Sequence, residues 1–231
     1  MCGIVAYVGN KKASPILLKG LKRLEYRGYD SVGIALLNHR INVTKTKGKV
    51  ELLNSNREIE LSSSKIGIGH TRWATHGEPN DINSHPHLSG DSKMALVHNG
   101  IIENYSSIKK DLLSKGHIFQ SDTDSEVLIH FIEDIQKQEN CNLERALRLA
   151  LKRIVGAYVI VIINEDEPET LYAARKGSPL VIGIGEGEHF LASDATPIIE
   201  YTDKVVYVND HEVAIVKANE LILRTLDDES K

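Results

Sequence analysis

The chain has 231 residues, and 28 basic against 32 acidic side chains give it a formal net charge of −4. This length suits one large domain or two small ones and is enough to bury a substantial core. The mild, mixed charge forms no long basic stripe, which argues against nucleic-acid binding. No apolar run approaches the roughly 18–20 residues of a membrane helix, and the N-terminus lacks the features of a secretory signal. We therefore expect a cytoplasmic protein without a nucleic-acid or membrane partner.

The first part of the chain is predicted to consist mainly of strands. The apolar run Gly3–Gly9 predicts a buried strand that ends in a turn. Ser14 and Pro15 predict the N-cap and first residue of a helix. Apolar and polar residues alternate at Ile41–Lys47, as is typical of a solvated strand. We expect it to pair with a buried strand at Ser31–Leu37. Two further buried strands are expected at 65–71 and 94–98.

Helices are expected in the middle of the chain, with more strands after them. A loop at 76–88 is long for a compact domain and therefore functional or disordered. Apolar residues at helical spacing predict helices at 104–115, 125–137 and 143–154. Strands are predicted at 158–163, 170–174, 180–185, 189–192, 205–208, 212–216 and 221–226. Helices grouped between two sets of strands favour an α+β layered sandwich over an alternating parallel fold.

The chain contains two cysteines, Cys2 and Cys141, which exclude a disulfide scaffold and a four-cysteine zinc site. Removal of Met1 would leave a thiol and a free α-amine on Cys2. The amine, with a pKa of about 7.7–8.0, can accept the thiol proton near neutral pH, as in N-terminal nucleophile enzymes. A small buried residue that opens a strand is the alternative interpretation of Cys2. Nothing near Cys141 in the sequence would activate its thiol.

Five other residues are candidates for a site, and most of them also allow a structural interpretation. Asn99-Gly100 is a turn signal, but an Asn amide and an adjacent Gly N–H also make an oxyanion hole. The Arg72 guanidinium suits a carboxylate. Asp124 can cap the helix expected at 125 or bind a cationic group. Arg27 lies in an expected tight turn and is typical of a packed or salt-bridged residue.

Five of the ten histidines lie between positions 70 and 98, which raises the question of a zinc site. No carboxylate stands at a ligand-like spacing beside them, and the neighbouring residues are Arg, Trp and Asn. Histidines that cap loop backbone are the favoured alternative. The five residues are His70, His76, His85, His87 and His98.

Taken together and in order, these fragments resemble one family. They are Cys-Gly-Ile-Val at 2–5, Leu-Glu-Tyr-Arg-Gly-Tyr-Asp-Ser at 24–31, His-Thr-Arg-Trp-Ala-Thr-His-Gly at 70–77, Ser-His-Pro-His at 84–87, Val-His-Asn-Gly-Ile-Ile-Glu-Asn at 97–104 and Ser-Asp-Thr-Asp-Ser-Glu at 121–126. The series resembles the glutaminase domains of the glucosamine-6-phosphate synthase family. The likeness continues through Ala-Arg-Lys-Gly-Ser-Pro-Leu-Val-Ile-Gly at 174–183 and Ala-Ser-Asp at 192–194. At 121–126, where a helix is expected to start, the family more often has Ser-Glu-Thr-Asp-Thr-Glu, but Asp124 is retained.

The resemblance implies a four-layer αββα sandwich, the N-terminal nucleophile hydrolase fold, that hydrolyses L-glutamine without a metal or cofactor. It implies that residues 1–231 are one glutaminase domain, and that the family's sugar-isomerase domains, its partners in the same polypeptide, are absent from this chain. The resemblance further implies that the released ammonia serves, in the full-length enzyme, to convert fructose 6-phosphate to glucosamine 6-phosphate.

The resemblance also assigns roles to residues of the reaction centre. Cys2 would be the nucleophile, with its α-amine as the general base. Asn99 and Gly100 would form the oxyanion hole, and Arg27 would support the site.

Further residues would bind the substrate. Arg72 would hold the α-carboxylate of glutamine, with Thr75 and His76 alongside, and Asp124 would hold the α-ammonium. Trp73 resembles the indole that gates ammonia passage, and the 76–88 loop resembles a lid.

Two alternatives stay open on the sequence. One is a non-catalytic binding or metal-binding module. The other is a different class II amidotransferase domain, although the amidophosphoribosyltransferase pattern lacks the Thr-Arg-Trp-Ala-Thr-His-Gly motif.

Overall fold

The computed structural model describes residues 2–54, 56–73 and 77–227, which form two antiparallel sheets. One sheet has the strand order β11-β9-β10-β1-β4-β2-β3 and the other the order β13-β12-β8-β7-β6-β5. The strands of the first sheet are β1 (Gly3–Gly9), β2 (Ser31–Leu37), β3 (Ile41–Lys47), β4 (Ile66–Arg72), β9 (Val181–Gly185), β10 (Glu188–Ala192) and β11 (Val205–Tyr207). Those of the second are β5 (His87–Leu88), β6 (Met94–Ile102), β7 (Gly156–Asn164), β8 (Leu171–Lys176), β12 (Glu212–Lys217) and β13 (Glu220–Thr225).

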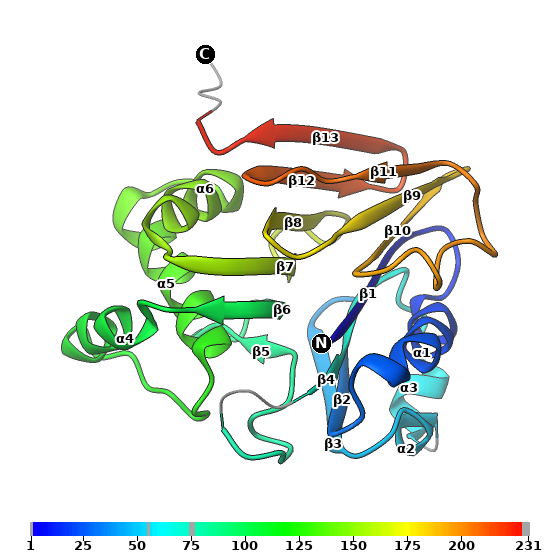
Figure 1. The fold of residues 1–231 in the computed structure, drawn as a ribbon, viewed down its shortest axis with the longest axis horizontal. Coiled ribbons are helices and arrows are strands. Elements are labelled where there is room, and N and C mark those ends of the chain that lie inside the picture. Colours follow the sequence, from blue (N-terminus) through cyan, green and yellow to red (C-terminus); the bar gives the residue numbers. More distant parts are fainter. Residues whose placement is uncertain (1, 55, 74–76, 228–231) are drawn as a thin grey trace.

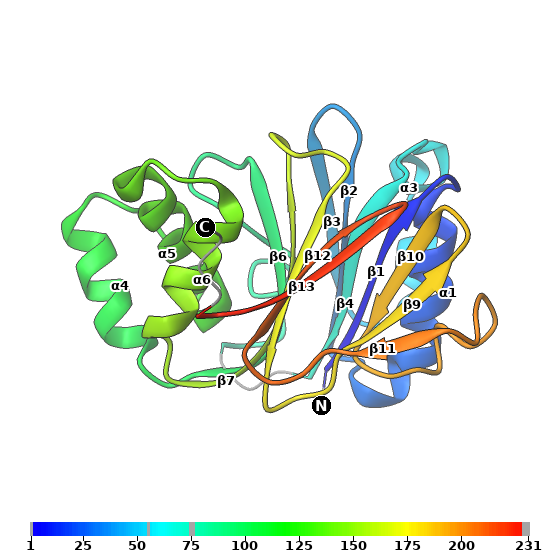
Figure 2. The same ribbon diagram turned by 90° about the horizontal axis from the view of Figure 1, so that it is seen from above.

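A helical layer covers the outer face of each sheet (Figure 1). Helix α1 (Ala13–Leu24) packs on the first sheet with the short helices α2 (Glu51–Asn54) and α3 (Arg57–Leu61). Helices α4 (Tyr105–Ser114), α5 (Asp124–Glu139) and α6 (Leu143–Arg153) cover the second sheet. Figure 2 shows the four layers edge-on in the order helix, sheet, sheet, helix, which confirms the expected αββα sandwich. Within the described residues, none of the helices combines the length and the apolar character needed to cross a membrane.

Successive side chains of β4 face alternately the space between the two sheets and helix α1. Ile66 and Ile68 pack between the sheets, whereas the intervening glycines face α1. A Cβ atom on Gly69 would lie 2.8 Å from Leu21 of that helix, so glycine permits this close approach. Because side chains alternate, His70 and Arg72 follow the isoleucines into the space between the sheets. Polar groups thus replace the apolar core where β4 ends.

Most of the strand predictions are confirmed, and the expected cap of the first helix is wrong. Helix α1 begins at Ala13, and its N-cap is Lys12, which makes no side-chain capping bond. The N–H of Ala13 instead donates to the carbonyl of Ser64 at 2.7 Å, so a distant segment satisfies the helix end. Ser14 is buried within the first turn. The tight turn expected at Arg27 is a 3₁₀ turn over Glu25–Arg27, whereas helices α2 and α3 were not predicted.

The turn predicted at Asn99-Gly100 is also wrong, because both residues lie inside β6, where they pair with β7. Gly100 has a φ of +139°, and a Cβ atom there would lie 2.0 Å from the carbonyl oxygen of Ala157. Glycine is therefore required by a close approach of two strands rather than by a chain reversal. The long loop predicted at 76–88 contains the short strand β5 at its end.

Candidate active site

A cavity of about 380 Å³ lies between the ends of the two sheets. Cys2 directly precedes β1 and Arg72 ends β4, and these antiparallel neighbours place Gly3 opposite Thr71. The start of one strand and the end of the other therefore meet at the same edge. Seven of the nine predicted site residues line the cavity, namely Cys2, Arg27, Arg72, Trp73, Asn99, Gly100 and Asp124. The other two, Thr75 and His76, lie outside the described residues.

The Cys2 thiol is held beside the backbone that follows β4. Its Sγ accepts the Trp73 N–H at 3.2 Å and lies 3.5 Å from the Trp73 carbonyl oxygen. Burial raises the pKa of this thiol, and the Trp73 N–H and the charges of Arg72 and Arg27 oppose the rise only in part. The thiol is consequently protonated near neutral pH, so a reaction as nucleophile needs a base to take its proton.

The Asn99 side chain reaches Cys2 from the opposite sheet. Its Nδ2 donates to the Cys2 carbonyl oxygen at 3.1 Å, across 97 positions of sequence. Gly100 follows it on the cavity wall. An amide N–H and a neighbouring backbone N–H at one side of the nucleophile are the components of an oxyanion hole.

Opposite charges line the cavity next to the thiol. The buried guanidinium of Arg72 donates to the carbonyl oxygens of Gly77 and Glu78 at 3.3 and 3.4 Å, and burial lowers its pKa. Asp124 is buried at the start of α5 and accepts the Ile102 N–H at 2.8 Å. A cation and an anion in one small cavity suit the carboxylate and ammonium groups of an amino acid.

The capping role considered for Asp124 is wrong. The N-cap of α5 is Thr123, whose side chain accepts the Glu126 N–H at 3.2 Å. Asp124 is the first residue inside the helix, where a carboxylate is also favoured by the helix dipole. One of its carboxylate oxygens accepts the Ile102 N–H of β6, and the other accepts the hydroxyl of Ser125, the next residue of the helix, at 3.4 Å. Asp124 also lines the cavity.

Arg27 and Trp73 form parts of the cavity rim. Arg27 donates to the Ser193 carbonyl oxygen at 2.9 Å and lies 3.8 Å from the Asp194 carboxylate, which ties the 3₁₀ turn to the segment after β10. Trp73 is 45% exposed and meets the Tyr29 ring edge-on, with 5.4 Å between the ring centroids.

His70 contacts the site but was not among the predicted site residues. Its Nε2 lies 2.9 Å from Asn99 Oδ1 and 3.0 Å from the His98 carbonyl oxygen. The signal in the sequence is its place two residues before Arg72, because residues i and i+2 of a strand face the same side.

Four of the five histidines between 70 and 98 lie together beside the cavity, and His85 and His98 line it. The fifth, His76, lies outside the described residues. The rings of His85 and His98 each contact the Ser125 hydroxyl at 2.9 Å, and His87 contacts the Thr123 hydroxyl at 3.0 Å. Burial lowers the pKa of His85 and of His87 well below the ordinary value, so both rings are neutral. These contacts tie β6, β5 and His85 just before it to side chains at the start of α5 rather than to loop backbone, which gives the histidines a structural role.

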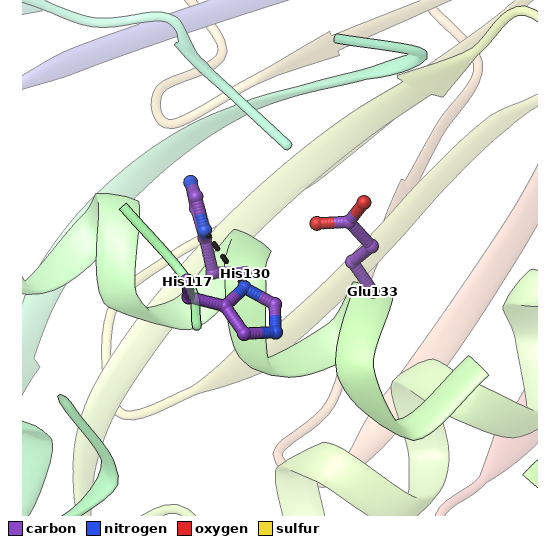
Figure 3. A group of neighbouring side chains, drawn as sticks. All are labelled: His117, His130 and Glu133. Atoms are coloured by element: carbon purple, nitrogen blue, oxygen red, sulfur yellow. Dashed lines mark hydrogen bonds between the residues drawn. The ribbon is translucent and has the colours of Figure 1, made fainter. Parts of the chain in front are cut away.

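Another polar cluster, His117, His130 and Glu133, lies away from the cavity on and beside α5 (Figure 3). Its ligand-type atoms lie within 4.8 Å of one another. The two Nδ1 atoms are 3.1 Å apart and share a hydrogen bond. The Glu133 carboxylate accepts the N–H groups of Gly90 and Asp91 at 2.8 and 3.2 Å. These bonds anchor the 90–91 turn to the helix.

Comparisons of the sequence identify close relatives. A model of the glutamine amidotransferase domain family matches residues 39–225. The glutamine–fructose-6-phosphate aminotransferase [isomerizing] of Bacteroides thetaiotaomicron is 58% identical over 219 residues, covering 94% of this chain and 36% of the relative. The protein of the same name from Thermococcus kodakarensis is 49% identical over 228 residues, covering 98% of this chain and 38% of the relative. The chain thus spans a little over a third of the curated relatives it matches.

Solved structures share the fold. The glutamine phosphoribosylpyrophosphate amidotransferase from B. subtilis superposes with a TM-score of 0.85 at 26% identity, over 99% of this chain and 50% of that one. A class-II glutamine aminotransferase domain protein from Silicibacter pomeroyi superposes with a TM-score of 0.62 at 15% identity, over 97% of this chain and 99% of that one. The extent of the family match and the identity to the curated relatives show the family, and the solved structures agree with the layered fold. The chain belongs to the glutamine amidotransferase domain family.

Proposed function

We propose that this chain hydrolyses the side-chain amide of L-glutamine to glutamate and ammonia through a thioester on Cys2. The observation that carries the proposal is the contact of Cys2 with both Trp73 N–H and Asn99 Nδ2 in a cavity that also contains Arg72 and Asp124. A nucleophile, an oxyanion donor and two charges that match an α-amino acid are the groups that amide transfer requires.

The base in this mechanism is the α-amine of Cys2, freed by removal of Met1. Burial raises the pKa of the thiol, so the thiolate forms only when a base accepts the proton. A terminal amine with a pKa of about 7.7–8.0 is partly unprotonated at neutral pH and can do this. The thiolate then attacks the amide carbon, and the C–S bond forms.

The tetrahedral intermediate carries its negative charge on the former carbonyl oxygen. Asn99 Nδ2 and the Gly100 N–H donate to this oxygen, and the protonated amine of Cys2 gives its proton to the departing ammonia. Water then attacks the thioester, the same amine accepts the water proton, and glutamate leaves with the thiol restored.

Substrate orientation follows from the two charged side chains. Arg72 binds the α-carboxylate of glutamine, Asp124 the α-ammonium, and Thr75 and His76 add contacts from the segment after Trp73. Arg27 supports the site through its bonds to the 193–194 segment. The 76–88 loop acts as a lid that closes over bound glutamine.

We further propose that the chain serves as the ammonia-supplying domain of a longer polypeptide. Its curated relatives are named glutamine–fructose-6-phosphate aminotransferase [isomerizing], and the matched regions are only 36% and 38% of their length. In such a protein the sugar-isomerase domains would receive ammonia past the exposed Trp73 indole and make glucosamine 6-phosphate. Both cysteines are free, which suits the reducing cytoplasm where we place the protein.

The proposal is tested by glutamate release from glutamine. We expect activity that is unchanged by a metal chelator, since every step uses only groups of the chain. Loss of activity on chelation would favour the metal-binding alternative. Full activity of a protein that retains Met1 would contradict the role of the α-amine.

Substitution of Asn99 by alanine tests the oxyanion hole. We expect kcat to fall by about 10²–10³-fold with little change in KM, because the donor acts on charge that develops after binding. Steady-state kinetics measure both constants. An unaltered kcat would remove Asn99 from this role.

Substitution of Arg72 by lysine tests the carboxylate contact. A lysine ammonium keeps the charge but loses the planar two-point donor geometry of the guanidinium. We expect KM for glutamine to rise first, by about tenfold, the effect of losing roughly one charge-assisted hydrogen bond. A constant KM would indicate that Arg72 does not bind the substrate carboxylate.

A further inference from the structure

We propose that His70 is a positioning residue that fixes the Asn99 amide in the orientation needed for the oxyanion hole. The inference rests on the proposed function and deepens it. It concerns which end of the amide faces Cys2.

The neighbours of His70 determine its tautomer. Nε2 lies 3.0 Å from the His98 carbonyl oxygen, an atom that can only accept a hydrogen bond. Nε2 therefore carries the proton. The same N–H faces the Asn99 side chain at 2.9 Å, so the Asn99 atom that meets it is the acceptor Oδ1.

The orientation of one amide end determines that of the other. With Oδ1 held by His70, the NH₂ group of Asn99 is directed to the Cys2 carbonyl oxygen at 3.1 Å. The flipped amide would set an N–H donor against the His70 N–H and turn its oxygen toward Cys2. An oxygen in that place would repel the oxyanion, so the flipped form cannot support catalysis.

The environment of His70 keeps its proton in place. The ring is buried, and burial lowers its pKa to about 3, against smaller opposing effects of the bonds to Asn99 and the His98 carbonyl. Its Nδ1 has no hydrogen-bond partner within the part of the chain that the structure describes. The His85 ring packs against it at 4.1 Å between centroids, so a second proton would place a charge against a neutral ring in the interior. His70 thus donates from one fixed tautomer throughout the working pH range.

Two substitutions separate the hydrogen bond from the volume of the ring. Leucine at position 70 fills similar space but cannot donate, whereas the glutamine amide can place a donor near the position of Nε2. We expect His70→Leu to lower kcat by about 10–10²-fold, somewhat less than loss of the donor itself, with KM nearly unchanged. His70→Gln should restore most of kcat. Neither variant should shift the pH dependence of kcat between pH 6 and 9, because His70 does not titrate there.

A matched control removes a buried histidine elsewhere in the same sheet. His189 in β10 is buried, and its Nδ1 contacts the Lys217 carbonyl oxygen at 2.8 Å, away from the cavity. His189→Leu should lower the melting temperature as His70→Leu does but leave kcat unchanged. A fall of kcat in both variants to the same extent would show that general loss of stability explains the effect, and would overturn the inference.

A double-mutant cycle with Asn99→Ala gives the sharpest result. If His70 acts only through the Asn99 amide, His70→Leu costs nothing further once the amide is gone, so the double variant has the kcat of Asn99→Ala alone. If the double variant instead shows the product of the two separate losses of kcat, the inference is overturned.

If His70→Leu does not fold, His70→Gln is compared with His70→Asn, whose amide is too short to reach Asn99. Retained kcat in the first and reduced kcat in the second supports the inference, and equal values overturn it.

Failure of this inference can be told apart from failure of the proposed function. An inactive wild-type chain, or activity that survives Cys2→Ala, contradicts the proposed function. An active wild-type chain that is slowed by Asn99→Ala, with additive His70 effects, contradicts only the role of His70.

Discussion

Replacing Cys2 with alanine should abolish glutamine hydrolysis and leave the sandwich folded. The side chain lies at the cavity before β1, and among the residues that the structure describes its thiol hydrogen-bonds to the Trp73 backbone alone, so its removal costs the fold little. Without the thiol no thioester can form, and the loss should reach at least about 10⁴-fold, as for nucleophiles of other acyl-transfer enzymes. Glutamate release measures the activity, and thermal unfolding measures the fold.

The second cysteine provides the matched control. Cys141 lies beyond the end of α5, outside the cavity of Cys2, and packs against the core beneath the helical layer. Cys141→Ala should retain the wild-type rate. If Cys2→Ala still releases glutamate normally, or if both variants lose activity equally, Cys2 is not the nucleophile.

Acid should destabilise the chain well before its carboxylates are protonated. Burial lowers the pKa of His70, His85 and His87, and that of His130 and His189 shifts the same way. Below the ordinary histidine pKa of about 6.5 the unfolded chain binds protons that the folded chain does not. The stabilisation is therefore present above pH 6.5 and is lost as the pH falls.

The expected size of this effect is large. Each such histidine contributes up to about 1.4 kcal/mol per pH unit, so three lower the free energy of unfolding by about 4 kcal/mol per unit below pH 6. A total stability of about 5–15 kcal/mol would be largely lost near pH 4–5. Urea unfolding at pH 7.5, 6.5 and 5.5 measures the slope.

A single substitution identifies the source of the pH dependence. His87 lies behind the cavity and contacts Thr123, so His87→Gln removes one of the three histidines while an amide can still reach the hydroxyl. The slope should fall by up to about 1.4 kcal/mol per pH unit, the contribution of one such histidine. Equal stability at pH 7.5 and 5.5 would show that the buried rings do not remain neutral in the folded chain.

Sequence periodicity was enough to predict the layers of this fold. Alternation and apolar runs give strands such as Gly3–Gly9 and Ser31–Leu37 with their observed bounds, because each must bury one or both faces. Local signals failed where tertiary contacts replace them. Ser14 does not cap α1 because Ser64 from a later segment satisfies the helix end. Asn99-Gly100 is not a turn because β7 pairs through it.

The difference between local sequence signals and tertiary contacts applies to the candidate site as well. An ordered series of motifs identified Cys2, Asn99 and Asp124 together, and the structure places them around one cavity. Nothing local in the sequence reveals that His70 meets Asn99, because the contact joins β4 of one sheet to β6 of the other. Such contacts depend on how the two sheets stack, which strand periodicity leaves undetermined.

The central claim is an acyl intermediate on an N-terminal cysteine, and intact-mass spectrometry after rapid acid quenching tests it directly. The chain is mixed with glutamine and quenched within one turnover. Its intact mass is measured, and peptide digestion then locates any added mass. The account predicts a first peptide that starts at Cys2, lacks Met1 and carries one added glutamyl group on its thiol. An active chain that keeps Met1, or whose N-terminal peptide never gains the glutamyl mass while glutamate accumulates, would contradict it.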